Sequence, residues 1–534
     1  MAAADAPRLK PADDGAGNKK LRDEFDQRLT DARRQKTDVE LDLREGYFFT
    51  KPRLSRSVRS DSTPEKRPDD AEELATGIGT EANEDFATEL INGFFPPNVP
   101  WAVPKAGETV EDDVWDQVKD DAVKLNDAVF RGIRSSNFDA ELATALVPEG
   151  GIGTVALLIE DRVAHEPIRV QHIPFRELEI NIGPMGTVDD RFIVRHTQAR
   201  NVPALFPRSE LPAKVAAKIA KKPTEIVECR WGWWRDWSEP NDIVWRAVSM
   251  VMGEVVTDDF IRGHGSCPLV VFRFAPDSLH AWGNGPTLDS LPMLRIVDIL
   301  AEATQNRADI SIAPPLAYPD DGIMNFEAGL RSGMAYPKRP GARGEIEPLY
   351  FTGDPDLGFY TLADLEKSIR RKHFADYPEQ RGDTPPTATQ WLDEMVKSQR
   401  RVGTWGQKFW DEGPAEIYRR FYYLLEKRGS VEALTIEGRD VALRPSNPAT
   451  KAQELQEVQT GMHLLEVAKS FFPQTSQVAI DEMKTIKNFK DKLGDRLVVL
   501  RSEDEQKGIM QALMNAGENM LGSAAQAEGG APPA

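Results

Sequence analysis

The chain contains few of the residue types that usually carry catalysis or metal binding. Its two cysteines, Cys229 and Cys267, lie apart in the sequence, and its seven histidines include no HxxxH or HxH pair. Two thiols are too few for a disulfide framework or a zinc site. We therefore expect both cysteines to be reduced, small apolar residues that are buried or half-buried, and we expect neither a metal nor a cofactor.

Phosphate-binding and nucleophile motifs are also missing from the sequence. It contains no GxxxxGK[ST] loop, which excludes a P-loop motor, and no GxSxG or HExxH motif. The stretch EGGIGT at 149–154 is rich in glycine, but it lacks GxGxxG spacing and precedes a strand-like run instead of a helix. Carboxylates are abundant, but abundance without a pocket identifies no site. We expect a protein that is not an enzyme, with a hydrolase using paired carboxylates as the alternative of a different class.

Aromatic residues and charge bear on contact with nucleic acid. The stretch WGWWRDW at 231–237 holds four of the eleven tryptophans. Such clusters can stack on bases, but the strand-like neighbours favour packing in a core or a subunit interface. The net charge is −19, which is the wrong sign for a protein that binds DNA through cations that neutralise phosphates.

The first half of the chain reads as helices followed by strands. Its length of 534 residues exceeds the size at which one hydrophobic core stops growing, so we expect more than one sub-domain. Residues 1–20 are polar, and dense charges predict an exposed helix over 21–47. Apolar spacing predicts helices over 71–95 and 110–146. From 153 to 274 the period changes to two, which predicts a β-rich body with a short polar helix inside it.

The second half is mainly helical by pattern. A long helix is predicted over 286–310, and a second over 359–376. Between them, 311–358 contains seven prolines and is expected to be extended, since proline breaks helices. A capping box and an apolar face then predict a long helix from 387, with a kink at Gly413-Pro414. The last hundred residues are also mainly helical by pattern, and the tail is low in complexity.

Six blocks of the sequence resemble, in the same order, those of the podovirus-type bacteriophage portal proteins, the head-to-tail connecting protein family. The first block ends in a turn formed by Phe95, Pro96, Pro97, Pro100 and Trp101. The blocks are LATGIGTEANEDFATELINGFFPPNVPWAVPK, SSNFDAELATALVPEGGIGTVALLIED, PLVVFRFAPDSLHAWGNGP, TPPTATQWLDEM, SNPATKAQELQEV and DKLGDRLVVLRSEDEQK. The sequence departs from the family pattern at Asn284, where a basic residue is common, and at Gln390 and Trp391, which replace an acidic and an aliphatic residue.

The resemblance implies a multi-domain α+β fold that assembles as a ring. The portal fold has a β-rich wing, a helical stem, a Pro-rich clip and a helical crown. The implied division is 1–70 arm and exposed helix, 71–285 wing, 286–310 first stem helix, 311–358 clip, 359–376 second stem helix, 377–386 channel loop, 387–428 long wing helix, 429–505 crown, and 506–534 C-terminal helix and disordered tail.

The resemblance also implies a function. Twelve copies would form a ring at one capsid vertex of the virion, made in the host cytoplasm and with no membrane span. Double-stranded DNA would pass through its channel, without sequence specificity, during packaging and ejection. Capsid and scaffolding proteins would meet the wing, and terminase and then the tail adaptor would meet the clip. A strongly negative ring would repel phosphates and keep the DNA centred. The nearest alternative is another ring-forming virion component, such as a tail adaptor.

Three groups of residues are candidates for contact with DNA or partners. They are the channel-loop residues Tyr377, Pro378, Glu379, Gln380, Arg381, Gly382 and Asp383; the stem basic group Lys367, Arg370, Arg371 and Lys372; and the clip group Lys338, Arg339 and Arg343. The channel loop could instead be a plain surface turn. The stem basic group could reflect the preference of cations for a helix C-terminus, contact with DNA, or ion pairs between subunits. The clip group could dock an acidic adaptor or terminase surface.

Overall fold

The computed structural model divides the chain into two compact units, Met1–Asn447 and Pro448–Ala534, and each is described by itself. The predicted crown would begin at 429, but the division falls after 447 because the strand at 442–445 pairs within the first unit. The residues that the structure describes are 16–54, 57–62, 74–97, 99–105, 112–163, 166–207, 209–239, 242–277, 279–313, 316–319, 335–338, 347–348, 355–375, 408–431, 435–436, 439–440, 442–445, 448–471, 485–486 and 489.

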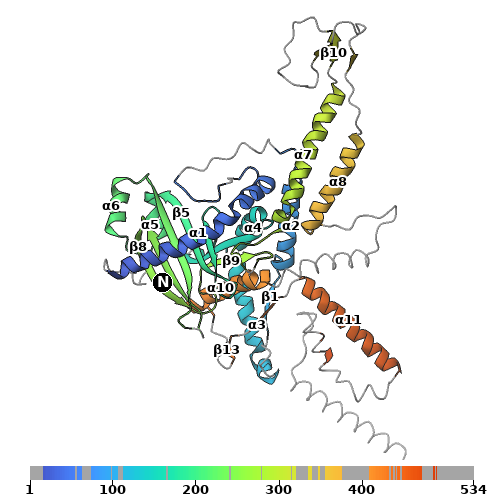
Figure 1. Ribbon diagram of the computed structural model, residues 1–534. Coiled ribbons are helices and arrows are strands. Elements are labelled where there is room, and N and C mark those ends of the chain that lie inside the picture. Colours follow the sequence, from blue (N-terminus) through green and yellow to red (C-terminus); the bar gives the residue numbers. More distant parts are fainter. Residues whose placement is uncertain are drawn as a thin grey trace, which may run out of the picture. The chain divides into compact units, whose positions relative to one another are not determined.

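A five-stranded antiparallel sheet forms one part of the first unit, in the order β4-β5-β6-β7-β8. Each strand pairs with the next in sequence, and all five lie within the region for which the alternating pattern predicted a β-rich body. A short 3-10 turn and two short helices connect β5 to β6 (Figure 1). The strands are β4 (Leu178–Ile182), β5 (Val188–Gln198), β6 (Ile226–Asp236), β7 (Val244–Val251) and β8 (Glu254–Arg262), and the connecting helices are η2 (Ala199–Asn201), α5 (Val202–Leu205) and α6 (Ala213–Lys221).

Helix α1 (Ala16–Thr50) confirms the helix predicted over 21–47, but it packs against this sheet with a buried stripe, so the predicted exposure was wrong. Its apolar side chains recur mostly at every fourth position, which gives a narrow stripe that the many charges obscure in the sequence. Phe25 meets Phe192 at 5.2 Å and Trp234 at 6.0 Å between ring centroids. Gly232 lies beneath this contact, because a Cβ there would come within 2.6 Å of the Phe25 ring.

Lys36 of α1 is also buried. Its Nζ donates to the carbonyl oxygens of Phe175 and Leu178, both at 2.6 Å, and to Oε1 of Glu179 at 3.1 Å. Burial lowers the pKa of Lys36, although the Glu179 carboxylate opposes this effect. The ammonium group is therefore held by three acceptors and fixes α1 to the start of β4.

The tryptophan cluster and both cysteines serve packing. Trp233 and Trp234 are buried on opposite faces of β6. Trp231 stacks on Phe206, with centroids 5.2 Å apart and planes 15° from parallel. Cys229 and Cys267 are buried and free, as predicted.

A second sheet and several helices complete the body of the first unit. The predicted helix over 110–146 is two helices, α3 and α4, because the side chain of Asn137 bonds the backbone of Val170 between them, at 2.8 Å and 2.9 Å. The sheet order is β3-β2-β9, and β1 pairs with β15. These elements are α2 (Ile78–Phe94), β1 (Ala102–Lys105), α3 (Asp112–Arg134), α4 (Phe138–Glu149), β2 (Thr154–Val163), β3 (Glu166–His172), β9 (Leu269–Arg273), α10 (Pro414–Lys427), β13 (Thr435–Ile436), β14 (Arg439–Asp440) and β15 (Ala442–Pro445).

Two long helices, α7 (Pro286–Ile312) and α8 (Pro355–Lys372), lie side by side (Figure 1). Val297 of α7 and Ile369 of α8 share an apolar core with α2 and the end of α1. Three short strands lie between the two helices in sequence and form a small sheet in the order β11-β10-β12. They are β10 (Leu316–Pro319), β11 (Ala335–Lys338) and β12 (Glu347–Pro348).

The second unit contains α11 (Pro448–Phe471). Among the described residues of both units, no helix is long and apolar enough to cross a membrane.

Candidate functional site: the base of the helix pair

The stem basic group lies at the end of α8, beside α2 and the first turn of α7. Arg370 makes ion pairs with Glu81 at 2.6 Å and with Asp85 at 3.6 Å, both on α2. Lys372 donates from Nζ to the carbonyl oxygen of Asp289 at 2.9 Å. Lys367 and Arg371 also have interaction partners. At least two of the four cations therefore fasten α8 within one chain, a role that the sequence did not suggest.

The acidic side of this contact lies on α2. Burial raises the pKa of Asp85, and Glu81 and Glu84 add to the effect while Arg370 opposes it. One turn further along, burial raises the pKa of Glu89, with Asp85 as a second cause. The α2 surface next to α8 therefore concentrates carboxylates, whose charge is partly offset by Arg370 and, at Glu84, by Lys51.

Two glycine-rich turns fasten the start of α7 to the body. Gly285 N donates to Ile152 O, and Thr287 N to Gly151 O, both at 2.9 Å. A Cβ on Gly285 would come within 2.1 Å of Gly151 O, and Gly153 has a φ of +112°. Only glycine permits this approach and this φ value. The EGGIGT stretch at 149–154 is thus bonded through its backbone to the GNGP segment at 283–286, where α7 begins. These two segments together are called the glycine joint.

The last turn of α8 is fixed by a buried histidine. His373 Nδ1 lies 2.9 Å from Ile369 O, and its Nε2 lies 3.1 Å from Thr287 Oγ1. A carbonyl oxygen can only accept, so Nδ1 carries the proton and Nε2 accepts from the threonine hydroxyl. Burial lowers the pKa of His373 to about 4, so the ring is neutral near pH 7. This neutral ring connects the end of α8 to the start of α7.

Phe374 follows in the left-handed region, with a φ of +60°. This conformation costs a non-glycine residue about 1–2 kcal/mol. Its ring stacks on Phe86 at 5.9 Å and meets Phe274 edge-on at 6.1 Å. Packing therefore holds the strained residue at the point where the chain leaves α8 for the 376–407 segment.

The chain returns from 376–407 to the same place. Phe409 lies in a short helix at 408–412 and packs on Phe94 at 4.9 Å, on Phe272 at 5.3 Å and on Phe274 at 6.4 Å. Phe274 thus contacts an aromatic ring on each side of the segment that contains the predicted channel loop.

Arg273 binds the helix at 408–412 through Glu412. Its side chain is fully buried, and Nε and Nη2 donate to the two oxygens of Glu412 at 3.0 Å and 2.5 Å. Nη2 also reaches Gly186 O at 3.0 Å, and Nη1 reaches the carbonyl oxygens of His280 and Ala281 at 3.3 Å. Arg273, Glu412 and His373 were not among the predicted site residues. The sequence signal that could have identified Arg273 is a single arginine within the otherwise apolar run LVVFRF.

The remaining predicted residues fall where side chains are not described. Lys338 is the last residue of β11, and only its backbone is described. The others lie outside the described residues: Tyr377, Pro378, Glu379, Gln380, Arg381, Gly382 and Asp383 of the channel loop, and Arg339 and Arg343 of the clip group.

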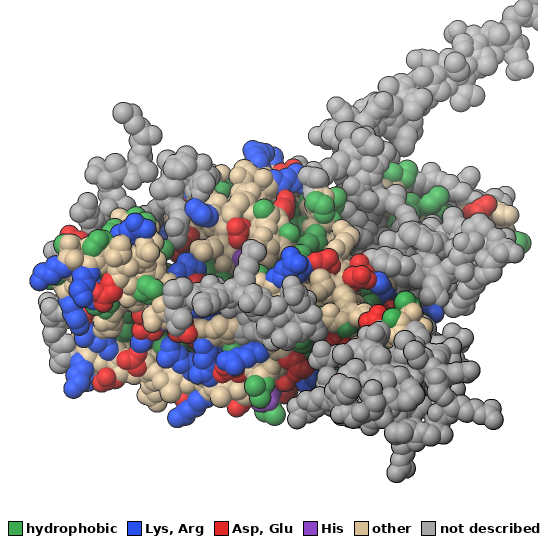
Figure 2. Space-filling model, turned by 90° about the horizontal axis from the view of Figure 1, so that it is seen from above, with side chains coloured by type: hydrophobic (Ala, Val, Ile, Leu, Met, Phe, Trp, Pro, Cys, Tyr) green, Lys and Arg blue, Asp and Glu red, His purple; other side chains and the backbone are tan. Residues whose placement is uncertain are grey.

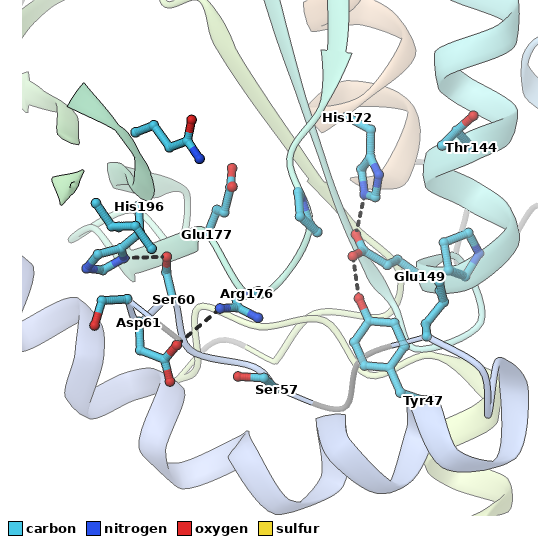
Figure 3. Close-up of a pocket in the computed structure, with 16 residues that line it drawn as sticks. Tyr47, Ser57, Ser60, Asp61, Thr144, Glu149, His172, Arg176, Glu177 and His196 are labelled. Atoms are coloured by element: carbon cyan, nitrogen blue, oxygen red, sulfur yellow. Dashed lines mark hydrogen bonds and ion pairs between the residues drawn. The ribbon is translucent and has the colours of Figure 1, made fainter. Parts of the chain in front are cut away.

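A separate cavity of about 600 Å³ contains the most enzyme-like arrangement in the described part of the chain (Figure 3). Glu149 is fully buried; its Oε1 accepts from Tyr47 OH at 2.5 Å and from Phe175 N at 3.1 Å, and its Oε2 from His172 Nε2 at 3.0 Å. Burial alone would lower the pKa of His172, but Glu149 and neighbouring Glu141 and Glu177 raise it overall. Both carboxylate oxygens accept hydrogen bonds from within the chain, so this network joins α1, α4 and β3.

The opposite wall of the cavity is a polar strap, residues 57–62 (Figure 3). Arg176 pairs with Asp61 at 3.2 Å, and the Ser60 hydroxyl lies 2.8 Å from Nδ1 of His196. These contacts hold the strap against the β3–β4 connection and the end of β5.

The surface seen in Figure 2 mixes both signs of charge. Lys and Arg side chains lie among Asp and Glu side chains over the described part of that face. It presents no broad basic surface of the kind that high-affinity DNA-binding proteins show.

A family model described as bacteriophage head to tail connecting protein matches residues 22–496, most of the chain. The chain belongs to this family. The glycine joint, Arg273 and the helix pair thus belong to a head-to-tail connector. A comparison with curated proteins finds no match.

Solved structures from gene transfer agent (GTA) particles are similar at low identity. A chain in the virion of a native GTA particle has 12% identity and a TM-score of 0.33, with 76% of this chain and 93% of that chain covered. A chain in the neck of an empty GTA particle, computed with C6 symmetry, has 11% identity and a TM-score of 0.34, with 79% and 94% covered. A chain in the neck of a native GTA particle, computed with C12 symmetry, has 14% identity and a TM-score of 0.28, with 70% and 87% covered. The family match decides the assignment.

Proposed function

We propose that this connector is the subunit of the portal ring at one capsid vertex, and that the genome passes through this ring during packaging and ejection. Family membership supports this proposal, and one structural observation carries it. The helix pair α7–α8 is fixed at its base by the glycine joint, by His373 and by Arg370. In this proposal α7 and α8 are the stem, the insert at 311–358 is the clip, and the sheets with their helices are the wing. Twelve copies would form the ring, as the family resemblance implies.

The proposed conduit handles DNA by weak contact and does not act as an enzyme. The net charge of −19 and the acidic α2 surface would repel phosphates around a ring, so the duplex would slide without tight binding. Arg381 is the one cation of the proposed channel loop, Tyr377–Pro386. Terminase and then the tail adaptor would dock on the clip, where Lys338, Arg339 and Arg343 lie, and capsid and scaffolding proteins on the wing.

Ring formation is tested on the purified chain by native mass spectrometry and negative-stain microscopy. We expect a closed ring whose side view shows a wing and a narrower stem. A monomer or small oligomer under all conditions would overturn the proposal, and a ring without a stem would favour a tail adaptor.

The channel loop is tested in heads assembled with a variant that lacks residues 379–383. We expect rings to assemble normally while packaged or retained DNA falls, because the stem base and the body remain intact. The matched control replaces the same five residues with glycine and serine, which keeps the loop length. Normal full-length genomes in heads that carry the deletion would overturn the role of the loop.

The clip group is tested by reversing its charges with Lys338→Glu, Arg339→Glu and Arg343→Glu. We expect weaker binding of the tail adaptor and of terminase with unchanged ring formation. Unchanged binding of both would show that these cations do not dock them.

A further inference from the structure

A groove of about 570 Å³ lies between the five-stranded sheet and α10, apart from the base of the helix pair. Its floor consists of small side chains, because Ala247 and Ser249 of β7 face the groove. In the register of the sheet, Trp231 of β6 lies opposite Ser249, and Asp259 of β8 lies opposite Ala247. The groove therefore has an aromatic side along β6, a polar side along β8, and α10 as its other wall.

Arg420 of α10 is the buried cation of this groove. Its Nε donates to Ile159 O at 3.0 Å and its Nη1 to Ser266 O at 2.7 Å and Gly265 O at 3.2 Å. Its guanidinium also lies over the Tyr423 ring, 5.5 Å from the centroid. Within the described part of the chain, no carboxylate lies at ion-pair distance from it, and its Nη2 has no hydrogen-bond partner. Burial lowers the pKa of Arg420 to about 10, so it remains cationic at neutral pH.

Ser266 adds a second unused donor. It is only 2% exposed, and its Oγ has no hydrogen-bond partner among the described residues. A buried hydroxyl without a partner costs about 1–3 kcal/mol. Because Ser266 O itself accepts from Arg420 Nη1, the two donors belong to one corner of the groove.

Each carboxylate that lines the groove has another cation nearby, and Asp161 forms an ion pair with its cation. Asp161 pairs with Arg428, Glu160 lies opposite Arg169 in the register of β2 and β3, and Lys427 lowers the pKa of Asp259, although burial and Asp258 raise it overall. Arg420 is therefore a lining cation without an ion pair among the described residues, although Glu160 and Asp161 lie near enough to favour its charged form. The missing complement is an anionic oxygen acceptor.

We propose that this groove binds an extended acidic peptide of a partner protein, with an Asp or Glu carboxylate accepting hydrogen bonds from Arg420 and Ser266. An apolar side chain next to that carboxylate packs on the stacked pair of Trp231 and Phe206. The proposal concerns a docking surface and stands whether or not the ring has the stoichiometry given above.

The test uses the full-length chain and two short peptides, acetyl-Leu-Glu-Phe-amide and acetyl-Leu-Gln-Phe-amide, in calorimetric titrations. The peptides differ only in the acid, so the expected preference for the Glu peptide, about tenfold, measures the charge-assisted hydrogen bonds. Ser266→Ala should weaken binding of the Glu peptide severalfold without lowering stability, because that hydroxyl has no internal partner. Ser135→Ala, on an exposed turn, is the matched control and should leave binding unchanged.

Arg420→Lys provides a second variant, provided that its melting temperature shows that it folds. It keeps the charge but loses the planar fork, and we expect the preference for Glu over Gln to shrink. Equal affinity for the two peptides, no binding at millimolar concentration, or an unaltered affinity in Ser266→Ala would each overturn the proposal. If only unassembled chains bind the peptide while assembled rings do not, a second copy occupies the groove and the partner-protein assignment is wrong.

Discussion

Arg273→Met should destabilise the first unit by about 3–5 kcal/mol. The substitution keeps an apolar stem but removes a fully buried cation and leaves Glu412, whose side chain is only 13% exposed, without its ion pair. Removing one member of a buried ion pair costs about 3–5 kcal/mol, because the other charge stays in place without compensation.

The double variant Arg273→Met/Glu412→Leu separates the ion pair from the other contacts of Arg273. It removes both charges, so the uncompensated carboxylate disappears. The carbonyl oxygens of Gly186, His280 and Ala281 still lose their donor, at about 1–3 kcal/mol for a buried group left unpaired. We therefore expect the double variant to be more stable than Arg273→Met alone, although less stable than the unmodified chain.

The assay is urea unfolding of all three variants and the unmodified chain, followed by tryptophan fluorescence and circular dichroism. Glu412→Leu alone serves as the third variant and closes the double-mutant cycle. A loss below about 1 kcal/mol in Arg273→Met, or a double variant at least as unstable as the single one, would refute the reasoning that Arg273 and Glu412 form a buried, mutually dependent pair.

Three further changes test other joints of the body. Gly153→Ala should unfold at clearly lower urea than Gly253→Ala, since a Cβ at Gly153 would lie 2.4 Å from Gly285 N while nothing lies within 4 Å at Gly253; both have positive φ, so equal losses would contradict the crowding argument. The pKa of His373 is about 4 in the folded chain, below its ordinary value, so the unfolded chain binds the proton first and stability should fall by up to about 3 kcal/mol between pH 6.5 and 4. His373→Gln should flatten this part of the stability curve measured against pH, and an unaltered slope would show that another group causes it. Lys36→Met should cost about 3–5 kcal/mol in urea unfolding and Lys36→Met/Glu179→Leu less, because the single change leaves the Glu179 carboxylate buried alone; equal losses would show that the ion pair is not the cause.

Local signals in the sequence were sufficient for most elements of the body. The helix predicted over 286–310 is α7, from Pro286 to Ile312, because Pro286 can start a helix and prolines follow its end. The alternating runs between 153 and 274 became β2–β9. Where the sequence reading failed, a side chain from elsewhere decided the local structure. Asn137 divides α3 from α4 through the backbone of Val170, and no local pattern contains that contact.

The base of the helix pair could not be assembled from the sequence, because its parts are distant along the chain. Arg273 and Glu412 are 139 positions apart, and Thr287 and His373 are 86 apart. Each residue taken singly is an ordinary polar residue. Only the antiparallel return of α8 along α7, and of the chain from 376–407 to β9, brings them together.

The residues on both sides of the 376–407 segment are attached to Phe274 or to its neighbour Arg273. The position of the segment can therefore be changed without changing the residues inside it. Phe274 touches Phe374 before the segment and Phe409 after it, and Arg273 holds Glu412. In the proposed conduit, a change inside the channel loop alters what the loop offers to DNA but leaves its two anchors unchanged. A change at Arg273 or Phe274 does the reverse, because the loop keeps its chemistry and loses its anchors. In the proposed conduit, where weak repulsion guides the DNA, the positions of the charges matter, so the buried anchors Arg273 and Phe274 should affect DNA retention as much as the loop does.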